Sequence, residues 1–193
     1  MSPRAGLDAK AVIAAAGALA DEHGLEAVTL AMLAAKLSVR SPSLYNHIQG
    51  LTDLRIQLAV YGLEMLHGAL ASAVTELTGD EAVHALAQAY VDFARAYPGI
   101  YEASQRYHDQ KNEAIREGAT LTFILVSNLL SASYALEGDA AVHAMRGFRS
   151  VLHGFSDLER GGGFGIAIDM NASLRVIVDA FIVGMKTLLK EAK

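Results

Sequence analysis

The sequence predicts an all-α protein, and two observations predict it. More than half of the 193 residues are hydrophobic (52%) and only 3 are prolines, so the chain can bury a core as one compact unit or two small ones. Alanine and leucine dominate, and the β-branched residues are scattered instead of alternating along the chain. We therefore expect mostly helix and almost no strand.

The first expected helix begins after Asp8, whose side chain can cap it, and ends at Gly24, which supplies a left-handed stop. An apolar stripe at helical spacing supports this assignment; its members are Val12, Ala16, Leu19 and His23. The helix is about four turns long.

Two shorter helices follow. Thr29 can cap the segment LAMLAAKL, and the next helix is expected to have Ser41 as N-cap and Pro42 at its first position, ending near Ile48. Only the link Ser38-Val39-Arg40 separates them. This is the layout of a helix-turn-helix, in which the second helix enters the major groove of DNA. We expect a three-helix DNA-binding domain over residues 1–54.

The remainder, residues 55–193, is expected to form a larger helical domain. Apolar residues recur at helical spacing in successive segments between turn signals such as Pro98-Gly99 and Gly161-Gly162-Gly163. The expected helices cover approximately residues 52–77, 81–97, 100–108, 110–136, 140–159 and 171–190.

The last two helices carry apolar seams that suggest a two-fold four-helix interface between two copies of the chain. Small residues beside the first seam allow helices to approach closely. The interface residues so predicted are Met145, Phe148, Leu152, Phe155, Ile177, Phe181 and Met185. The alternative is that both seams only fill the domain's own core.

The third helix offers polar side chains suited to DNA. On a helix that starts at Pro42, Leu44 and Ile48 face the core, and the exposed set is Ser41, Pro42, Ser43, Tyr45, Asn46 and His47. Asparagine can pair with adenine, and serine, tyrosine and histidine can donate to phosphates or bases. The alternative is an ordinary capped surface helix.

Local charge must support such binding, because the net charge of the chain is −5. Residues 1–50 are neutral by count, with four basic and four acidic side chains. Lys36 and Arg40 supply positive charge beside the third helix, and Arg4 can reach the minor groove.

An aromatic and methionine set in the larger domain predicts a pocket for an organic, largely apolar effector with one or two hydrogen-bonding groups. Its members are Tyr61, Met65, Tyr90, Phe93, Tyr97, Tyr101, Tyr107 and Phe123. The alternative is that these side chains are core residues.

Several classes of function find no support. The chain has no cysteine, its seven histidines lack metal-ligand spacing, and it has no nucleophile elbow, phosphate loop or dinucleotide fingerprint. We therefore expect no enzyme activity, no metal and no cofactor. The polar N-terminus and the charge-broken helices predict a cytoplasmic protein without a membrane span. A helical interaction protein that binds no operator, or a helical enzyme, remains an alternative.

The segment LSVRSPSLYNHI (residues 37–48) resembles the recognition helix of the tetracycline-repressor family, and GLEAVTLAMLAAKL (residues 24–37) resembles the helices before it. This resemblance implies a homodimeric repressor that binds double-stranded operator DNA and is released by a small effector. It adds Thr29 to the DNA-binding set. The segment RSVLHGFSDLERGGGFG (residues 149–165) is similar to the subfamily with a Trp-His-Gly type motif, with Leu152 in place of the tryptophan.

Three positions depart from the family pattern. Ser38 stands where glycine is common, so either serine accepts a left-handed conformation at a cost of about 1 kcal/mol or the turn differs. Ala31 and Leu51 stand where arginine and lysine often contact phosphate. Both replacements reduce the expected affinity for the DNA backbone.

Overall fold

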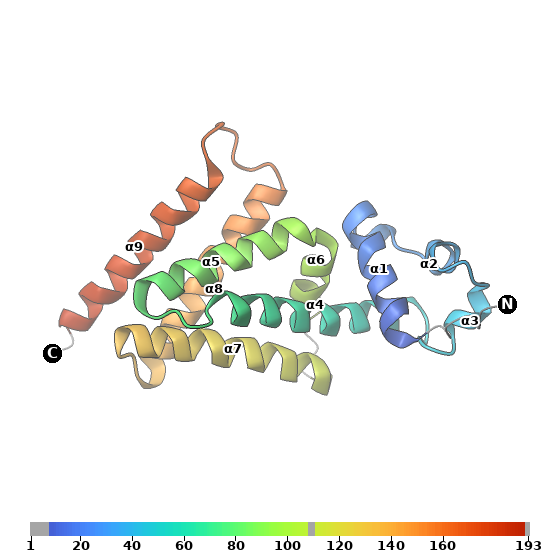
Figure 1. Cartoon of the computed structure of the whole chain (residues 1–193), viewed down its shortest axis with the longest axis horizontal. Coiled ribbons are helices and arrows are strands. Elements are labelled where there is room, and N and C mark those ends of the chain that lie inside the picture. Colours follow the sequence, from blue (N-terminus) through green and yellow to red (C-terminus); the bar gives the residue numbers. More distant parts are fainter. Residues whose placement is uncertain (1–7, 108–110, 192–193) are drawn as a thin grey trace. The chain divides into compact units, whose positions relative to one another are not determined.

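The all-α prediction is confirmed in a computed structural model that describes residues 8–107 and 111–191 (Figure 1). The helices in these ranges are α1 (Ala9–His23), η1 (Leu25–Ala27), α2 (Leu30–Lys36), α3 (Ser41–Leu44), α4 (Leu51–Ala73), α5 (Gly79–Ala96), α6 (Pro98–Arg106), α7 (Glu113–Tyr134), α8 (Gly138–Arg160) and α9 (Met170–Glu191). No strand occurs among the described residues.

The chain divides into two compact units. The first unit comprises residues 1–65 and 97–118, and the second comprises residues 66–96 and 119–193. Helix α4 therefore contributes its first part to one unit and its last part to the other. Because α6 groups with the N-terminal helices, the first unit includes more than the helix-turn-helix; the domain boundary at residue 54 remains a prediction.

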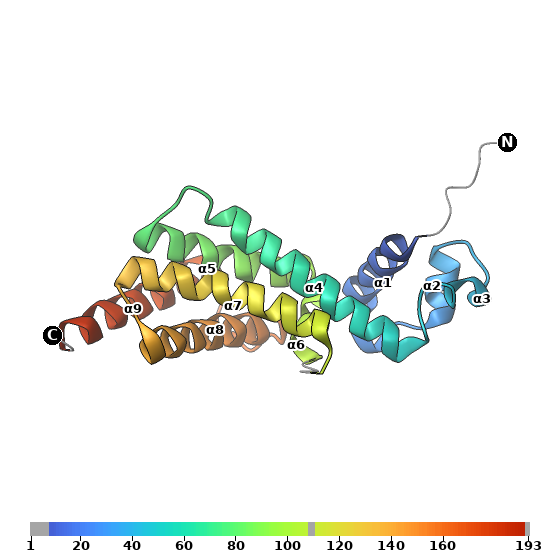
Figure 2. The same ribbon diagram turned by 90° about the horizontal axis from the view of Figure 1, so that it is seen from below.

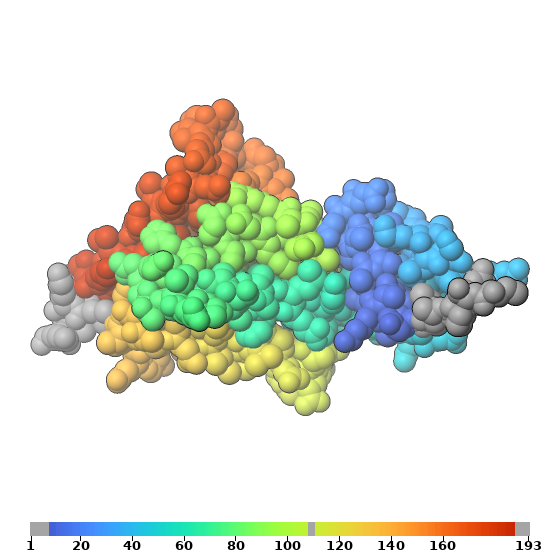
Figure 3. Space-filling view, in the orientation of Figure 1, coloured from blue at the N-terminus to red at the C-terminus, as the bar shows by residue number. Residues whose placement is uncertain are grey.

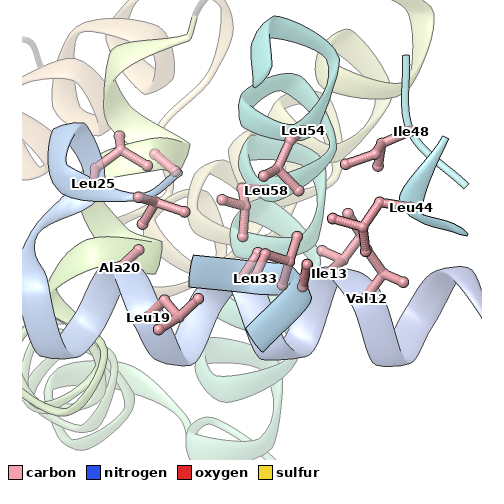
Figure 4. Close-up of a cluster of buried hydrophobic side chains, with 14 residues drawn as sticks. Val12, Ile13, Leu19, Ala20, Leu25, Leu33, Leu44, Ile48, Leu54 and Leu58 are labelled. Carbon is pink, nitrogen blue, oxygen red and sulfur yellow. The ribbon is translucent and has the colours of Figure 1, made fainter. Parts of the chain in front are cut away.

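The first unit is built around one apolar core from α1, α2, α3 and α4. Figure 4 shows Val12, Leu33, Leu44, Leu54 and Leu58 pointing toward one another, and each is at most 1% exposed. At roughly 1.5–3 kcal/mol for each large apolar side chain removed from water, this burial is the main stabilising contribution within the unit. Leu44 and Ile48 belong to the same core, as their spacing predicted.

Helix α1 begins and ends as expected. The Asp8 carboxylate accepts the Ala11 N–H at 2.6 Å, and Gly24 adopts a positive φ of 86°. His23 is a correction: it was assigned to the apolar stripe, but its side chain is exposed and lies next to Glu22, with 3.6 Å between Nε2 and Oε1. Its position in the last turn suits a polar group that can interact favourably with the helix dipole.

The helix-turn-helix forms, but α3 differs from the prediction at both ends. It ends at Leu44 instead of near Ile48, and Tyr45, Asn46 and His47 lie in the turn that follows it. Thr29 caps α2 by accepting the Met32 N–H at 3.2 Å, and Ser38 accepts the left-handed conformation with φ 54°. The N-cap of α3 is Arg40, without a side-chain hydrogen bond, so Ser41 is the first helical residue instead of the cap. Pro42 remains in the first turn, where its missing N–H costs nothing.

Helix α6 packs directly against the backbone of α1 within the first unit. A Cβ atom added to Gly99 would lie 2.2 Å from the carbonyl carbon and oxygen of Ala20, so only glycine fits there. Asp21 accepts the N–H groups of Gly99 and Ile100 at 2.8 and 3.0 Å. The start of α6 is thus capped by a residue 78 positions earlier in the sequence.

In the second unit, whose helices are drawn in Figure 2, α5 packs against both α8 and α9. Polar pairs join α5 to these two helices. Arg95 donates two hydrogen bonds to Glu159, at 2.9 and 2.8 Å, and these raise the pKa of the arginine. His84 lies 2.9 Å from Asp179. Near the other end of α5, Asp80 accepts from Lys186, which lowers the pKa of the carboxyl group.

The buried face of α7 is apolar apart from one tyrosine hydroxyl. Ile115, Val126, Leu130 and Tyr134 are buried, whereas Phe123 is 36% exposed. Burial, followed by the nearby Asp80 charge, raises the pKa of the Tyr134 hydroxyl, which donates to Asp80 at 3.2 Å.

No single helix in the described part of the chain is both long and apolar enough to cross a membrane. Helices α7 and α8 are long and apolar enough only as a pair, and a bend of 113° separates them.

Candidate DNA-binding helix and effector unit

The structure presents most of the predicted DNA-binding residues to solvent. Thr29, Lys36, Arg40, Ser41, Pro42, Tyr45 and Asn46 are exposed, and Ser43 and His47 are half-buried. Tyr45 is the most informative, because a large aromatic side chain that is 60% exposed gains little from packing and is available to a partner. Leu44, which lies between Ser43 and Tyr45 in sequence, is fully buried. Helix α3 is therefore anchored on one face and exposed on the other.

The segment after α3 is held by two residues that sequence reasoning missed. The Asp53 carboxylate accepts the Gln49 N–H at 2.7 Å and the Gln57 side-chain amide at 2.9 Å. The Gln57 amide also donates to the carbonyl oxygen of His47 at 3.4 Å. An aspartate in the first turn of a helix was the available signal, since it can accept the unpaired N–H groups at that end.

Positive charge near α3 is small but unneutralised. In the described residues no ion pair involves Lys36 or Arg40, so both cations are available to phosphates. Farther from α3, Glu26 pairs with Arg55 at 2.6 Å and with Arg106 at 2.7 Å. Arg4 lies outside the described residues.

The predicted effector residues are divided between the two units. Tyr90 and Phe93 of α5 are buried in the second unit, with 5% and 4% of their surface exposed. Tyr61, Met65, Tyr101 and Tyr107 belong to the first unit. Tyr61 and Tyr107 pack against its hydrophobic core, as the core alternative expected, and a role for these four at an effector site remains a prediction.

Two of the predicted effector residues are not enclosed. Tyr97 is 40% exposed at the N-cap position of α6, and Phe123 is 36% exposed on α7. Side chains that line an apolar pocket are mostly buried once a ligand is bound, so a role for these two residues at an effector site remains a prediction.

The α8 seam fills the core of the second unit instead of facing a partner. Met145, Phe148, Leu152 and Phe155 are each at most 8% exposed within a single chain. The Phe148 ring packs on Phe181 of α9, with 4.9 Å between centroids. Their assignment to a surface between two copies is therefore corrected, because side chains buried in one chain cannot also contact another.

Helix α9 and the preceding loop do expose apolar side chains. Ile177, Phe181 and Met185 are half-buried, while Val176 and Val183 are 67% and 62% exposed. All residues from 161 to 169 are exposed, and this loop lies on the surface in Figure 3, where it is drawn in orange. We call Val176, Val183, Ile166, Ile168 and Leu158 the α9-loop surface.

The loop has a defined geometry. Gly162 adopts φ 69° and Gly163 donates to the carbonyl of Leu158 at 2.7 Å, which ends α8 in a tight turn. The Phe164 ring then packs on Phe155, 5.2 Å between centroids. Ile168 donates to the Ile166 carbonyl at 2.9 Å, so the two exposed isoleucines flank a tight turn.

No group of three or more potential metal ligands occurs within the described ranges. The polar groups of the second unit are instead paired across its helices, as in the Arg95–Glu159 and His84–Asp179 contacts.

The chain is similar to known transcriptional regulators. It is 43% identical over 186 residues to the HTH-type transcriptional regulator YobS of Bacillus subtilis, covering 96% of each chain. The family model of the tetracyclin repressor-like C-terminal domain matches residues 83–181. The chain belongs to the tetracycline-repressor family of transcriptional regulators.

A second relative and one solved structure are also similar to this regulator. The regulator is 32% identical over 160 residues to the HTH-type transcriptional regulator Rv0681 of Mycobacterium tuberculosis, covering 81% of this chain and 72% of that one. Its fold is similar to that of a protein from Rhodococcus sp. RHA1, with a TM-score of 0.82 at 22% identity over 95% and 98% of the two chains. The Trp-His-Gly subfamily remains a prediction.

Proposed function

We propose that this regulator is a one-component repressor: a homodimer that binds an inverted-repeat operator through α3 and releases it when a small, largely apolar organic molecule enters the second unit. The observation that carries the proposal is that α3 and the residues after it have one side buried and the other exposed to solvent. Its Leu44 is anchored in the core of the first unit, while the neighbouring Tyr45 and Asn46 are exposed.

The exposed residues have separate tasks in this proposal. Asn46 reads a base, because its amide can donate to and accept from adenine at the same time. Tyr45, Lys36 and Arg40 contact phosphates and fix the register of the helix in the groove. The Asp53 and Gln57 contacts hold the backbone of His47 and Gln49, so that the segment after α3 is held in position before DNA arrives.

The α9-loop surface carries dimer formation in this proposal. In this proposal the exposed side chains of Val176 and Val183 on α9 and of the isoleucines of the loop form an apolar area at the interface; the loop has no charged residue between Arg160 and Asp169. Asp179, which lies between the two valines, pairs with His84. Such an area is costly in water and favours a partner of similar apolar character. A second copy of the chain provides the same surface through two-fold symmetry.

Helix α4 couples the effector to DNA in this proposal. Leu54 and Leu58 embed its first part in the core of the first unit, while residues 66–73 belong to the second unit. A molecule that contacts the second part therefore acts on the helix that positions the DNA-binding unit. The dimer can adopt two arrangements that differ in the distance between its two α3 helices. The molecule shifts the dimer from one arrangement to the other only if it binds one of them more tightly.

Selection from random duplex DNA tests the DNA-binding part. Wild-type protein is expected to enrich an inverted repeat, with binding that weakens steeply as salt rises. Asn46→Ala should relax the preference at one position of each half-site at a cost of about 1–3 kcal/mol. Tyr45→Phe is the matched control: it should weaken all sequences alike, and an unchanged preference in Asn46→Ala would refute the assigned role.

A further inference from the structure

Ser156 of α8 is a polar side chain buried without a hydrogen-bond partner. It is 4% exposed, and its hydroxyl oxygen is bonded to no described residue. It lies on the same face as Leu152, one turn earlier, which is also buried. The hydroxyl is therefore directed into the apolar interior of the second unit.

Other helical hydroxyl groups of this chain, although exposed, bond within their own helix. Ser150, on the same helix, donates to the carbonyl oxygen of Arg146 at 2.8 Å. Thr75 and Thr187 likewise donate to the carbonyl oxygens four residues before them, at 3.1 and 2.9 Å. Ser156 makes no such bond to Leu152, although this is the usual partner of a helical serine. Its hydroxyl group is thus left available.

A second unpartnered polar atom lies in the same unit. The Nδ1 atom of His67 on α4 is buried and bonded to no described residue. His67 is three residues before the fully buried Leu70, so both side chains share a face of α4. Depending on the tautomer, Nδ1 can accept or donate one hydrogen bond.

Buried polar atoms without partners destabilise a folded protein, and most such atoms in proteins are paired. An exception is expected where function requires the group, because the penalty is removed when a ligand binds. The geometry points to Ser156 and His67 as polar anchors of the effector, which rests on the effector response proposed above. The effector is then an apolar organic molecule that carries a hydroxyl or carboxyl group.

Paired probes that differ by one hydroxyl group test this inference. We would measure the affinity of the full-length protein for 2-naphthol against naphthalene, and for 1-decanol against decane. Wild type should prefer at least one alcohol by roughly tenfold or more, the effect of one well-formed hydrogen bond. Ser156→Ala should bring that ratio close to one, and His67→Phe should reduce it.

Ser150→Ala is the matched control on α8, because its hydroxyl is already satisfied within the helix. It should leave the ratio unchanged. The thermal midpoint of ligand-free Ser156→Ala should be equal to or above that of wild type, since the substitution removes an unsatisfied group. A lower midpoint would show that the hydroxyl has a structural partner and would overturn the inference.

Two further results would also overturn it: no binding of either alcohol, or a preference that Ser156→Ala leaves intact. Failure of the proposed function is distinguishable from these. If an alcohol binds through Ser156 but does not change operator affinity, the role of Ser156 in ligand binding is supported. The proposed release of operator DNA by an effector is then wrong.

Discussion

Asp21, near the end of α1, accepts the backbone N–H of Gly99 at 2.8 Å and that of Ile100 at 3.0 Å. With these two hydrogen bonds Asp21 caps α6, which begins 77 residues later in the sequence. The residue at the N-cap position of α6, Tyr97, makes no capping bond of its own. The N–H groups at the start of a helix need partners, and α1 supplies them here. Helix α6 is therefore joined to α1 by both packing and hydrogen bonds.

The first prediction concerns the stability that this cap provides. Asp21→Ala should lower the free energy of unfolding of the first unit by about 0.5–2 kcal/mol, the usual cost of losing an N-cap. Asp21→Asn should cost less, because its amide oxygen can still accept one N–H group. Chemical denaturation of the variants checks both values, and equal stability of wild type and Asp21→Ala would contradict the cap.

A second prediction follows from the pKa of Asp21, which burial raises although the two N–H groups oppose the effect. A raised carboxyl pKa means that the folded state binds the proton more tightly than the unfolded state. The contribution of Asp21 to stability therefore falls as pH rises from the ordinary value of 3.8 through the raised pKa. The free energy of unfolding is measured for wild type and Asp21→Asn between pH 4 and 7. The wild-type value minus the variant value should decrease as pH rises, and an increase would contradict the raised pKa.

Two glycines of α4 give a third, paired prediction. A Cβ atom at Gly62 would lie 2.7 Å from the carbonyl oxygen of Ile100, which is backbone and cannot easily move. Gly62→Ala should thus destabilise the protein by about 1–3 kcal/mol. Gly68→Ala, in the same helix with nothing within 4 Å, should stabilise it by about 0.5–1 kcal/mol. Thermal unfolding of the two variants should move in opposite directions.

The fourth prediction separates the dimer surface from the core. Val183 is 62% exposed in one chain, so Val183→Asp should leave the fold intact but shift sedimentation toward the monomer. Leu121→Asp, which changes an exposed apolar residue of α7, is the control and should leave the dimer unchanged. Phe155→Arg should instead unfold the second unit, because it buries an unpaired charge in its core. A wild type that sediments as a monomer would refute the dimer.

Local signals predicted the first unit well. The caps at Asp8 and Thr29 and the buried pair Leu44 and Ile48 all depend on residues within one or two turns of each other. At Ser38 the sequence left two conformations open, and the left-handed one is present. Such short-range hydrogen bonds and periodicities are visible in a sequence. The placement of α6 was not, because the Asp21–Gly99 bond joins residues 78 positions apart.

The second unit shows a different limit. The α8 seam was correctly predicted to be buried, but it packs within its own chain and not on a second copy; its residues are Met145, Phe148, Leu152 and Phe155. Apolar spacing does not show whether a helix packs on its own chain or on another. The unpartnered Ser156 gave no sequence signal at all, because a serine in a helix normally bonds to the preceding turn.

The most direct test of the proposed switch is an operator titration of wild-type protein with and without a compound that binds the second unit, at fixed salt concentration. A coupling of about 1–3 kcal/mol predicts that the compound weakens operator affinity by roughly 5- to 150-fold. Phe93→Leu, which changes a buried aromatic of α5, should alter this response while leaving compound-free affinity nearly unchanged. Operator affinity that stays the same for every compound that binds would contradict the switch and would leave a constitutive DNA-binding protein.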